Sequence, residues 1–232
     1  MVPLRVHLGL GANETPRNNR FTAMNGKTVE VDNTDAEGRL ILSGEFSTFH
    51  LLSRLNGRWT DALTYVSREY KPHTLIDVAT LTGYALFFLF SHNFQLMSGR
   101  AIGIALGEAF TGVFSSSPSL YDALAGAGAA EYDRMWALPL DEEGFGLQIY
   151  DSSNADLCNT GGRPAGSCTA ALFLKNFVEG LEEGEGEGVK WAHLDIACTV
   201  ESTRVGPYQR KGLTGRPVRA LVEFARRLSG EA

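Results

Sequence analysis

The chain has 232 residues, of which 44% are hydrophobic and 21% are charged, and its formal net charge is −6. This length and composition allow an ordinary globular core, which excludes a disordered or fibrous protein. A negative charge without a basic cluster argues against nucleic acid as a partner. The three cysteines are odd in number and form no CxxC pair, which suits a reducing compartment.

The sequence predicts no membrane segment and no secretory signal. The apolar run 84–90 is shorter than the roughly 18 residues of a membrane-helix candidate. The N-terminus lacks an apolar core flanked by basic residues and a cleavage site. We therefore expect a soluble, cytoplasmic protein that does not act at a membrane.

Strand and helix signals alternate along the chain. Asn25-Gly26 predicts a tight turn into a β-branched strand at 28–31. Nearly continuous apolar stretches predict further strands, and apolar residues at helical spacing predict helices. The predicted strands are 74–80, 135–140 and 191–197, and the predicted helices are 62–69, 117–132 and 213–227. Such alternation is typical of an α/β sandwich.

The segment 27–40, KTVEVDNTDAEGRL, contains the candidate chemistry. Asp35, Glu37 and Arg39 occupy every second position, so an extended backbone would project all three side chains from one face. Carboxylates are ligands for Mg, Mn or Zn ions, and a fixed arginine can hold an anion or a developing negative charge. The pattern predicts a hydrolytic metal site.

A structural interpretation of the same residues is a helix cap. Thr34 and Glu37 have the spacing of a capping box, in which each side chain bonds the other residue's backbone N–H. A resemblance favours the metal site instead: NTDAEGRL resembles, residue for residue, the signature octapeptide of the leucyl aminopeptidases, also called cytosol aminopeptidases. These are two-metal exopeptidases.

The resemblance implies a fold and a mechanism. The fold would be a three-layer α/β/α sandwich around a mixed β-sheet, incomplete at its N-terminal side. Two divalent ions, Zn or Mn, would activate a water molecule, with Asp35 and Glu37 as ligands and a bicarbonate at Arg39. The substrates would be peptides with a free N-terminus, such as those that begin with leucine, and the assembly would be a homo-hexamer. Four further residues would shape the substrate cleft: Asn33, Thr80, Leu81 and Gly83.

The resemblance also predicts a domain organisation. Residues 1–20 would be a segment foreign to the family, and 21–232 a partial catalytic domain. Two stretches, 44–60 and 84–100, interrupt the family pattern and are predicted inserts. Their opening residues and in-frame position suggest translated introns.

The remaining motifs leave alternatives open. The family's other metal ligands and its catalytic lysine lie in an upstream glycine-rich motif that this sequence does not contain. The chain could therefore be an inactive fragment that serves as a structural subunit in an aminopeptidase hexamer. A nucleotide-binding module is disfavoured, because the glycine-rich loop 151–166 lacks the lysine of a phosphate loop. His193, Asp195 and Cys198 are interpreted as structural groups of a buried strand and its end.

Overall fold

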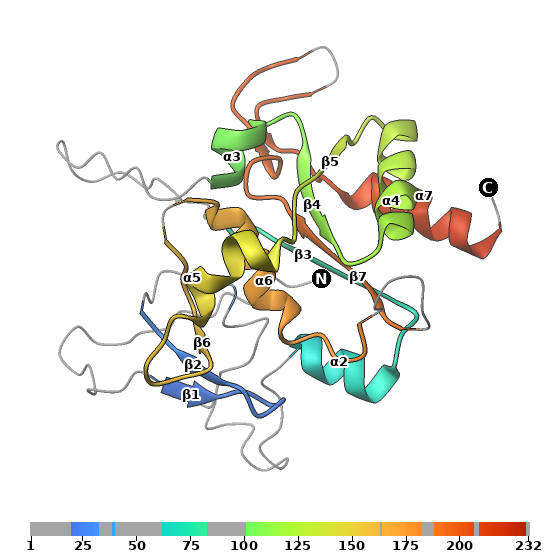
Figure 1. Cartoon of the computed structure of the whole chain (residues 1–232). Helices are drawn as coiled ribbons and strands as arrows, with labels where there is room; N and C mark the ends of the chain where they lie inside the picture. The colour runs from blue at the N-terminus through green and yellow to red at the C-terminus, as the bar shows by residue number, and fades with distance from the viewer. Residues whose placement is uncertain are drawn as a thin grey trace, which may run out of the picture.

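The computed structural model describes residues 20–32, 39, 62–82, 101–162, 164–181, 188–206 and 209–230 (Figure 1). The predicted inserts 44–60 and 84–100 lie outside these residues, as does 1–19. Within the described part, the helices are α2 (Ala62–Tyr70), α3 (Ala101–Leu106), α4 (Pro118–Ala130), the π-helical turn η1 (Glu142–Gly146), α5 (Leu147–Tyr150), α6 (Gly166–Lys175) and α7 (Val218–Ser229). The strands are β1 (Arg20–Thr22), β2 (Thr28–Glu30), β3 (Thr74–Ala79), β4 (Thr111–Ser115), β5 (Met135–Ala137), β6 (Leu157–Cys158), β7 (Lys190–Asp195), β8 (Glu201–Ser202) and β9 (Gly212–Leu213).

The main sheet has the strand order β3-β7-β4-β5. Strand β3 runs parallel to β7, β4 runs antiparallel to β7, and β5 runs parallel to β4. The sheet is therefore mixed, as expected. Because β3 and β7 are parallel and pair Ala79 with Asp195 at their last residues, the loops that follow both strands begin at one edge of the sheet.

Helices cover both faces of the main sheet (Figure 1). Successive side chains of β4 point to opposite faces. Val113 packs into a cluster with α4 and α7, whereas Phe114 packs with Cys168 and Ala171 of α6. The predicted α/β/α layering is confirmed.

Helix α6 fills the space between the main sheet and a smaller one. Its residues from Ser167 to Leu174 are all buried, which requires partners on several sides. One core cluster joins α6 to Trp191 of β7 and also to Val29 and Leu157 of the small sheet. This packing fixes the strand from which the chain continues toward Arg39.

The small sheet has the order β1-β2-β6, and it corrects one expectation. The Asn25-Gly26 turn is confirmed, with Gly26 at φ +89°, a conformation that glycine adopts without strain. The loop 151–166 was expected to lack strands, yet Leu157–Cys158 forms β6, parallel to β2. Both residues are buried, so tertiary pairing rather than local sequence defines this strand.

Two predicted elements differ from the structure by three residues or more at one end. The last helix begins at Val218, after Pro217, whereas Leu213 belongs to β9, so the expected start at residue 213 is wrong. Leu221 and Phe224 of α7 pack into the core as expected, together with Ala220, whereas Val218 and Val222, which were also expected to pack, are more than half exposed. Strand β5 ends at Ala137 and does not reach residue 140. No helix in the described ranges combines the length and apolar character needed to cross a bilayer.

Candidate active site

The candidate site lies at the edge of the main sheet where β3 and β7 end. In α/β sheets, ligands bind most often beyond the carboxyl ends of the strands. Here the loop 80–82 follows β3, and residues 196–199 follow β7. Leu81 and Thr82 are buried, whereas Thr80 is exposed.

Asp195 forms hydrogen bonds with both loops. Its Oδ2 accepts a 2.6 Å hydrogen bond from the Thr82 hydroxyl, and its Oδ1 accepts a 3.0 Å bond from the backbone N–H of Ala197. Burial raises the pKa of Asp195, and its interactions with His193, with the Thr82 hydroxyl and with backbone N–H groups, including that of Leu81, oppose this rise. Burial thus disfavours the ionised form of Asp195, and these neighbours favour it.

Arg39 brings a buried positive charge close to Asp195. The arginine side chain is 8% exposed, and its Nη1 donates a 3.0 Å hydrogen bond to the backbone oxygen of Asn159, just after β6. Burial lowers the pKa of Arg39 to about 10, and attraction to Asp195 opposes that change. Arg39 thus remains protonated at neutral pH.

Part of the Arg39 guanidinium is unused. Its Nε is buried without a hydrogen-bond partner among the described residues. Asn159, which accepts the Nη1 bond, is itself held by the backbone N–H of Asp32, a 2.8 Å donor to its side-chain oxygen. A buried cation with a free donor and a fixed position is suited to an anionic ligand. This geometry fits the small anion expected at Arg39.

The structure joins only some of the predicted site residues. Arg39 and Leu81 come to one place, because both interact with Asp195. Thr80 precedes Leu81 at the end of β3. The predicted metal ligands and two cleft residues lie outside the described residues: Asp35, Glu37, Asn33 and Gly83.

Comparison with known proteins identifies the family. A family model described as "Cytosol aminopeptidase family, catalytic domain" matches residues 11–51 and 56–222. The chain belongs to the cytosol aminopeptidase family. It is 42% identical over 207 residues to a cytosol aminopeptidase of Dictyostelium discoideum and 41% identical over 208 residues to one of Homo sapiens. Each match covers 89% of this chain and 32% of the relative.

A solved structure agrees with this assignment. The chain superimposes on a mutant of tomato leucine aminopeptidase with a TM-score of 0.67 and 34% identity, over 94% of this chain and 34% of the other. The chain spans about a third of the length of the curated relatives it matches.

Three site features of this aminopeptidase-family chain were not predicted as such: Asp195, Thr82 and Asn159. Asp195 was expected to be a hydrogen-bonded structural group, and it does accept two hydrogen bonds. Its position beside Arg39 was not foreseen, since the two residues are far apart in sequence. The available signal was an ionisable residue at the carboxyl end of a buried strand.

His193 was also interpreted as a hydrogen-bonded group, and this is confirmed for one ring nitrogen. Nδ1 lies 2.5 Å from Oδ1 of Asp77, whose Oδ2 accepts a 2.8 Å bond from Nε1 of Trp191. Nε2 of His193 is buried without a partner among the described residues. The three side chains form a buried polar group across β3 and β7.

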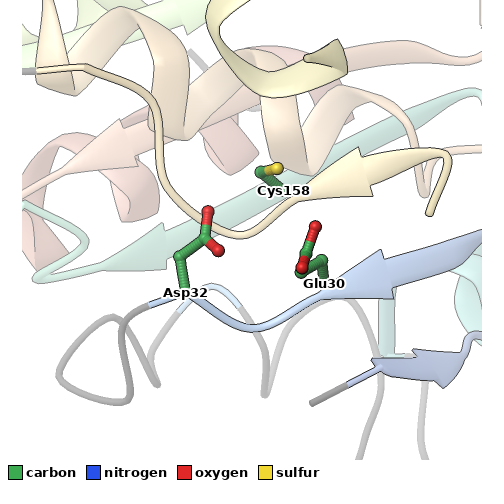
Figure 2. A group of neighbouring side chains, drawn as sticks. All are labelled: Glu30, Asp32 and Cys158. Atoms are coloured by element: carbon green, nitrogen blue, oxygen red, sulfur yellow. The ribbon is translucent and has the colours of Figure 1, made fainter. Parts of the chain in front are cut away.

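A second acidic group lies near the end of β2 (Figure 2). Ligand atoms of Glu30, Asp32 and Cys158 all lie within 4.8 Å of one another. Glu30 and Asp32 share the alternate spacing on which the prediction for Asp35 and Glu37 rests. However, burial, followed by the two carboxylates, raises the pKa of the Cys158 thiol to about 11, and Glu30 accepts a hydrogen bond from Ser152. With its thiol protonated, this group has a hydrogen-bonding role, and we assign no ion to it.

Proposed function

We propose that this chain supplies the C-terminal part of the active site of a metal-dependent aminopeptidase. The observation that carries the proposal is the buried Arg39, whose Nε has no hydrogen-bond partner in the described part of the chain and whose charge is attracted to Asp195 at the end of β7. Family membership supports peptide-bond hydrolysis, since the relatives bear the name cytosol aminopeptidase.

In this proposal two divalent ions, zinc or manganese, are held in part by Asp35 and Glu37. When bound, such ions lower the pKa of a shared water molecule and polarise the scissile carbonyl. Glu37 precedes Arg39 by two residues, so chain connectivity keeps their Cα atoms within about 7 Å of each other. The carboxylate donors and the arginine would therefore share one end of the sheet.

The remaining residues would bind and orient. Arg39 would hold bicarbonate or another small anion through its unused donor. Asn33, Thr80, Leu81 and Gly83 would line the cleft for a peptide with a free N-terminus. The Asp195 carboxylate joins Thr82 to the end of β7 and attracts Arg39. It would therefore help to hold the loop that lines the cleft at a constant position relative to Arg39.

A chimeric enzyme tests the proposal. The chain, without 44–60 and 84–100, replaces the matching third of the Dictyostelium discoideum cytosol aminopeptidase. We expect the chimera to release leucine from leucyl peptides with Mn or Zn, and to lose that activity on Asp35→Ala, Glu37→Ala or Arg39→Met. Asp122→Asn, an exposed carboxylate on α4, is the matched control and should retain activity.

A folded but inactive chimera would contradict the proposal. A chimera that unfolds cooperatively but hydrolyses nothing would contradict a catalytic contribution and support the inactive structural subunit instead. Size-exclusion chromatography of the same samples would test the proposed homo-hexamer.

A further inference from the structure

A pocket of about 460 Å³ lies away from the candidate active site. It is lined partly by Ser115 and Ser116 at the carboxyl end of β4. Because β4 runs antiparallel to β7, this end of β4 adjoins the beginning of β7, whereas Asp195 is at its end. The pocket and the Arg39 site are therefore at opposite ends of the main sheet.

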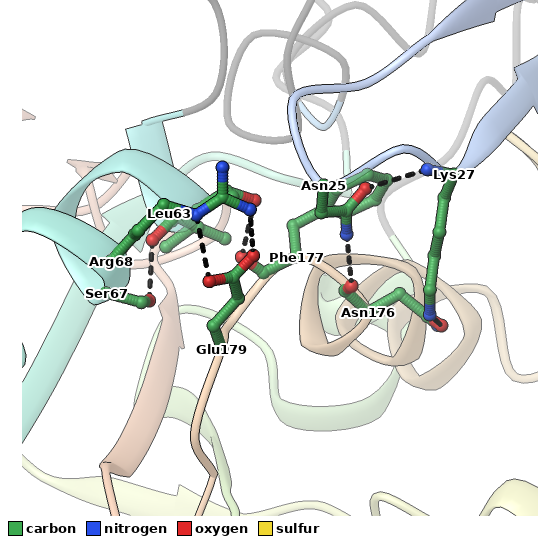
Figure 3. A network of polar contacts seen from close by, with 9 residues as sticks. Asn25, Lys27, Leu63, Ser67, Arg68, Asn176, Phe177 and Glu179 are labelled. Carbon is green, nitrogen blue, oxygen red and sulfur yellow. Dashed lines mark hydrogen bonds and ion pairs between the residues drawn. The ribbon is translucent and has the colours of Figure 1, made fainter.

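The residues that line this pocket carry one more positive charge than negative charge. Lys27, Lys175 and Glu142 all line it. Nζ of Lys175 pairs with Glu142 at 2.5 Å. Nζ of Lys27 instead donates to the neutral side-chain oxygen of Asn176, also at 2.5 Å (Figure 3). Two ammonium groups thus face one carboxylate.

A second carboxylate acts on Lys27 from outside the pocket lining. Asp156 attracts Lys27, but it is not part of the pocket lining, and its Oδ2 accepts 2.7 Å hydrogen bonds from the backbone N–H and the hydroxyl of Thr28. Burial lowers the pKa of Lys27, and Asp156 and Glu142 only oppose this effect. A further negative group in the pocket would relieve the desolvation of this ammonium.

Tyr150 and Asn176 add further polar groups to the pocket lining. Nδ2 of Asn176 donates a 3.1 Å hydrogen bond to the Tyr150 hydroxyl, which leaves the phenolic proton available for another acceptor. Each lysine ammonium has three protons, and its described side-chain partner takes one. The pocket therefore presents two ammonium groups and a phenol as donors.

We propose that this pocket binds a small anion with a single carboxylate or phosphate group, between Lys27 and Lys175. Such a ligand would offset the excess positive charge of the pocket lining and accept hydrogen bonds from both ammonium groups and from Tyr150. Glu142 limits the affinity, because its carboxylate competes for Lys175.

Calorimetric titration of the whole chain with inorganic phosphate, and separately with acetate, tests the proposal at constant ionic strength set with sodium chloride. We expect saturable binding of at least one anion, weakened about tenfold by Lys27→Met or Lys175→Met, since each removes a charge-assisted hydrogen bond. Lys211→Met, an exposed lysine outside the pocket, is the matched control and should bind as the unaltered chain does. The anion that binds more tightly identifies the chemical group.

A gain of affinity provides an independent test if a lysine variant does not fold. The Glu142 side chain is 50% exposed, so Glu142→Gln should fold normally. It releases Lys175 from its ion pair and should tighten binding by about two- to fivefold. Absence of saturable binding for both anions would overturn the proposal. So would binding that neither the Glu142 variant nor a folded lysine variant alters.

Discussion

Thr82 donates a 2.6 Å hydrogen bond to Oδ2 of Asp195, and both side chains are buried. The bond joins the loop after β3 to the end of β7, although the two residues are 113 positions apart in sequence. Asp195 also attracts the buried Arg39. The same carboxylate thus joins the loop after β3 to β7 and attracts the candidate site's arginine.

Replacing Thr82 with valine should lower the free energy of unfolding by about 1–3 kcal/mol. Valine preserves the shape of threonine but removes the hydroxyl, which leaves the buried Asp195 carboxylate with one donor fewer. Urea denaturation followed by circular dichroism measures the change. Thr203→Val is the control, because this exposed hydroxyl also bonds a carboxylate, that of Glu108, and its loss should alter stability by less than about 0.5 kcal/mol. Equal losses in both variants would contradict the role assigned to Asp195.

The longer elements could be predicted from local sequence. In α4, Leu120, Leu124 and Ala127 recur at helical spacing, and all three are buried against the main sheet. The apolar run of β7 predicted a buried strand, and its residues from Trp191 to Asp195 are buried. The same prediction was wrong for β3, where Asp77 is the only buried residue and Val78 is exposed. Strand β6 could not be predicted, because its two residues become a strand only through pairing with β2. Its partner is more than a hundred positions away.

The candidate site was less accessible to sequence reasoning. Arg39 was identified through its place in NTDAEGRL, and its burial agrees with a fixed cation. Asp195 and Thr82 carry no local motif, and their bond exists because parallel pairing brings the ends of β3 and β7 together. The spacing of carboxylates was also ambiguous, since Glu30 and Asp32 alternate as Asp35 and Glu37 do.

Asp77→Ala should be strongly destabilising, by roughly 2–5 kcal/mol, because it removes the acceptor for two buried donors. Those donors are Nε1 of Trp191 and Nδ1 of His193. Asp77→Asn should cost less, since one acceptor oxygen remains and the imidazole can change its tautomer. Urea denaturation monitored by tryptophan fluorescence gives both values. Asp122→Ala, on the exposed face of α4, controls for loss of a carboxylate, and an Asp77→Ala variant as stable as this control would contradict the buried network.

Asp133 should make stability depend on pH. Burial raises its pKa, and Arg216, whose Nε lies 3.6 Å from Oδ1, only partly opposes this change. In the window between the ordinary carboxyl pKa of about 3.9 and the raised value, the folded protein binds more protons than the unfolded chain. The free energy of unfolding should therefore fall as pH rises through that window, and the loss should be complete above it.

Asp133→Asn isolates this contribution, because asparagine does not titrate. The stability of the variant relative to the unaltered chain should increase as pH rises through the same window. Thermal or urea unfolding at a series of pH values measures the difference, with Asp122→Asn as a control on an exposed carboxylate. If the stability of the variant relative to the unaltered chain stayed constant with pH, or decreased as pH rises, burial would not be what raises the pKa of Asp133.

The last prediction concerns metal binding by the chain itself. We expect weak Mn²⁺ binding that Glu37→Ala abolishes. Two carboxylates at alternate positions form only part of a coordination shell, and affinity for hard cations grows with the number and charge of the oxygen ligands. Titration calorimetry measures the affinity.

Two further variants distinguish the candidate ligand sets. Cys158→Ala should leave Mn²⁺ affinity unchanged, because burial and the neighbouring carboxylates keep the thiol protonated and because Mn²⁺ prefers oxygen ligands. Glu30→Gln should likewise have little effect, since that carboxylate is occupied by the Ser152 hydroxyl. If instead Glu30→Gln abolished binding while Glu37→Ala preserved it, the ion would be held at the end of β2. The carboxylates of NTDAEGRL would then need a different role, of which the capping box formed by Thr34 and Glu37 is the leading candidate.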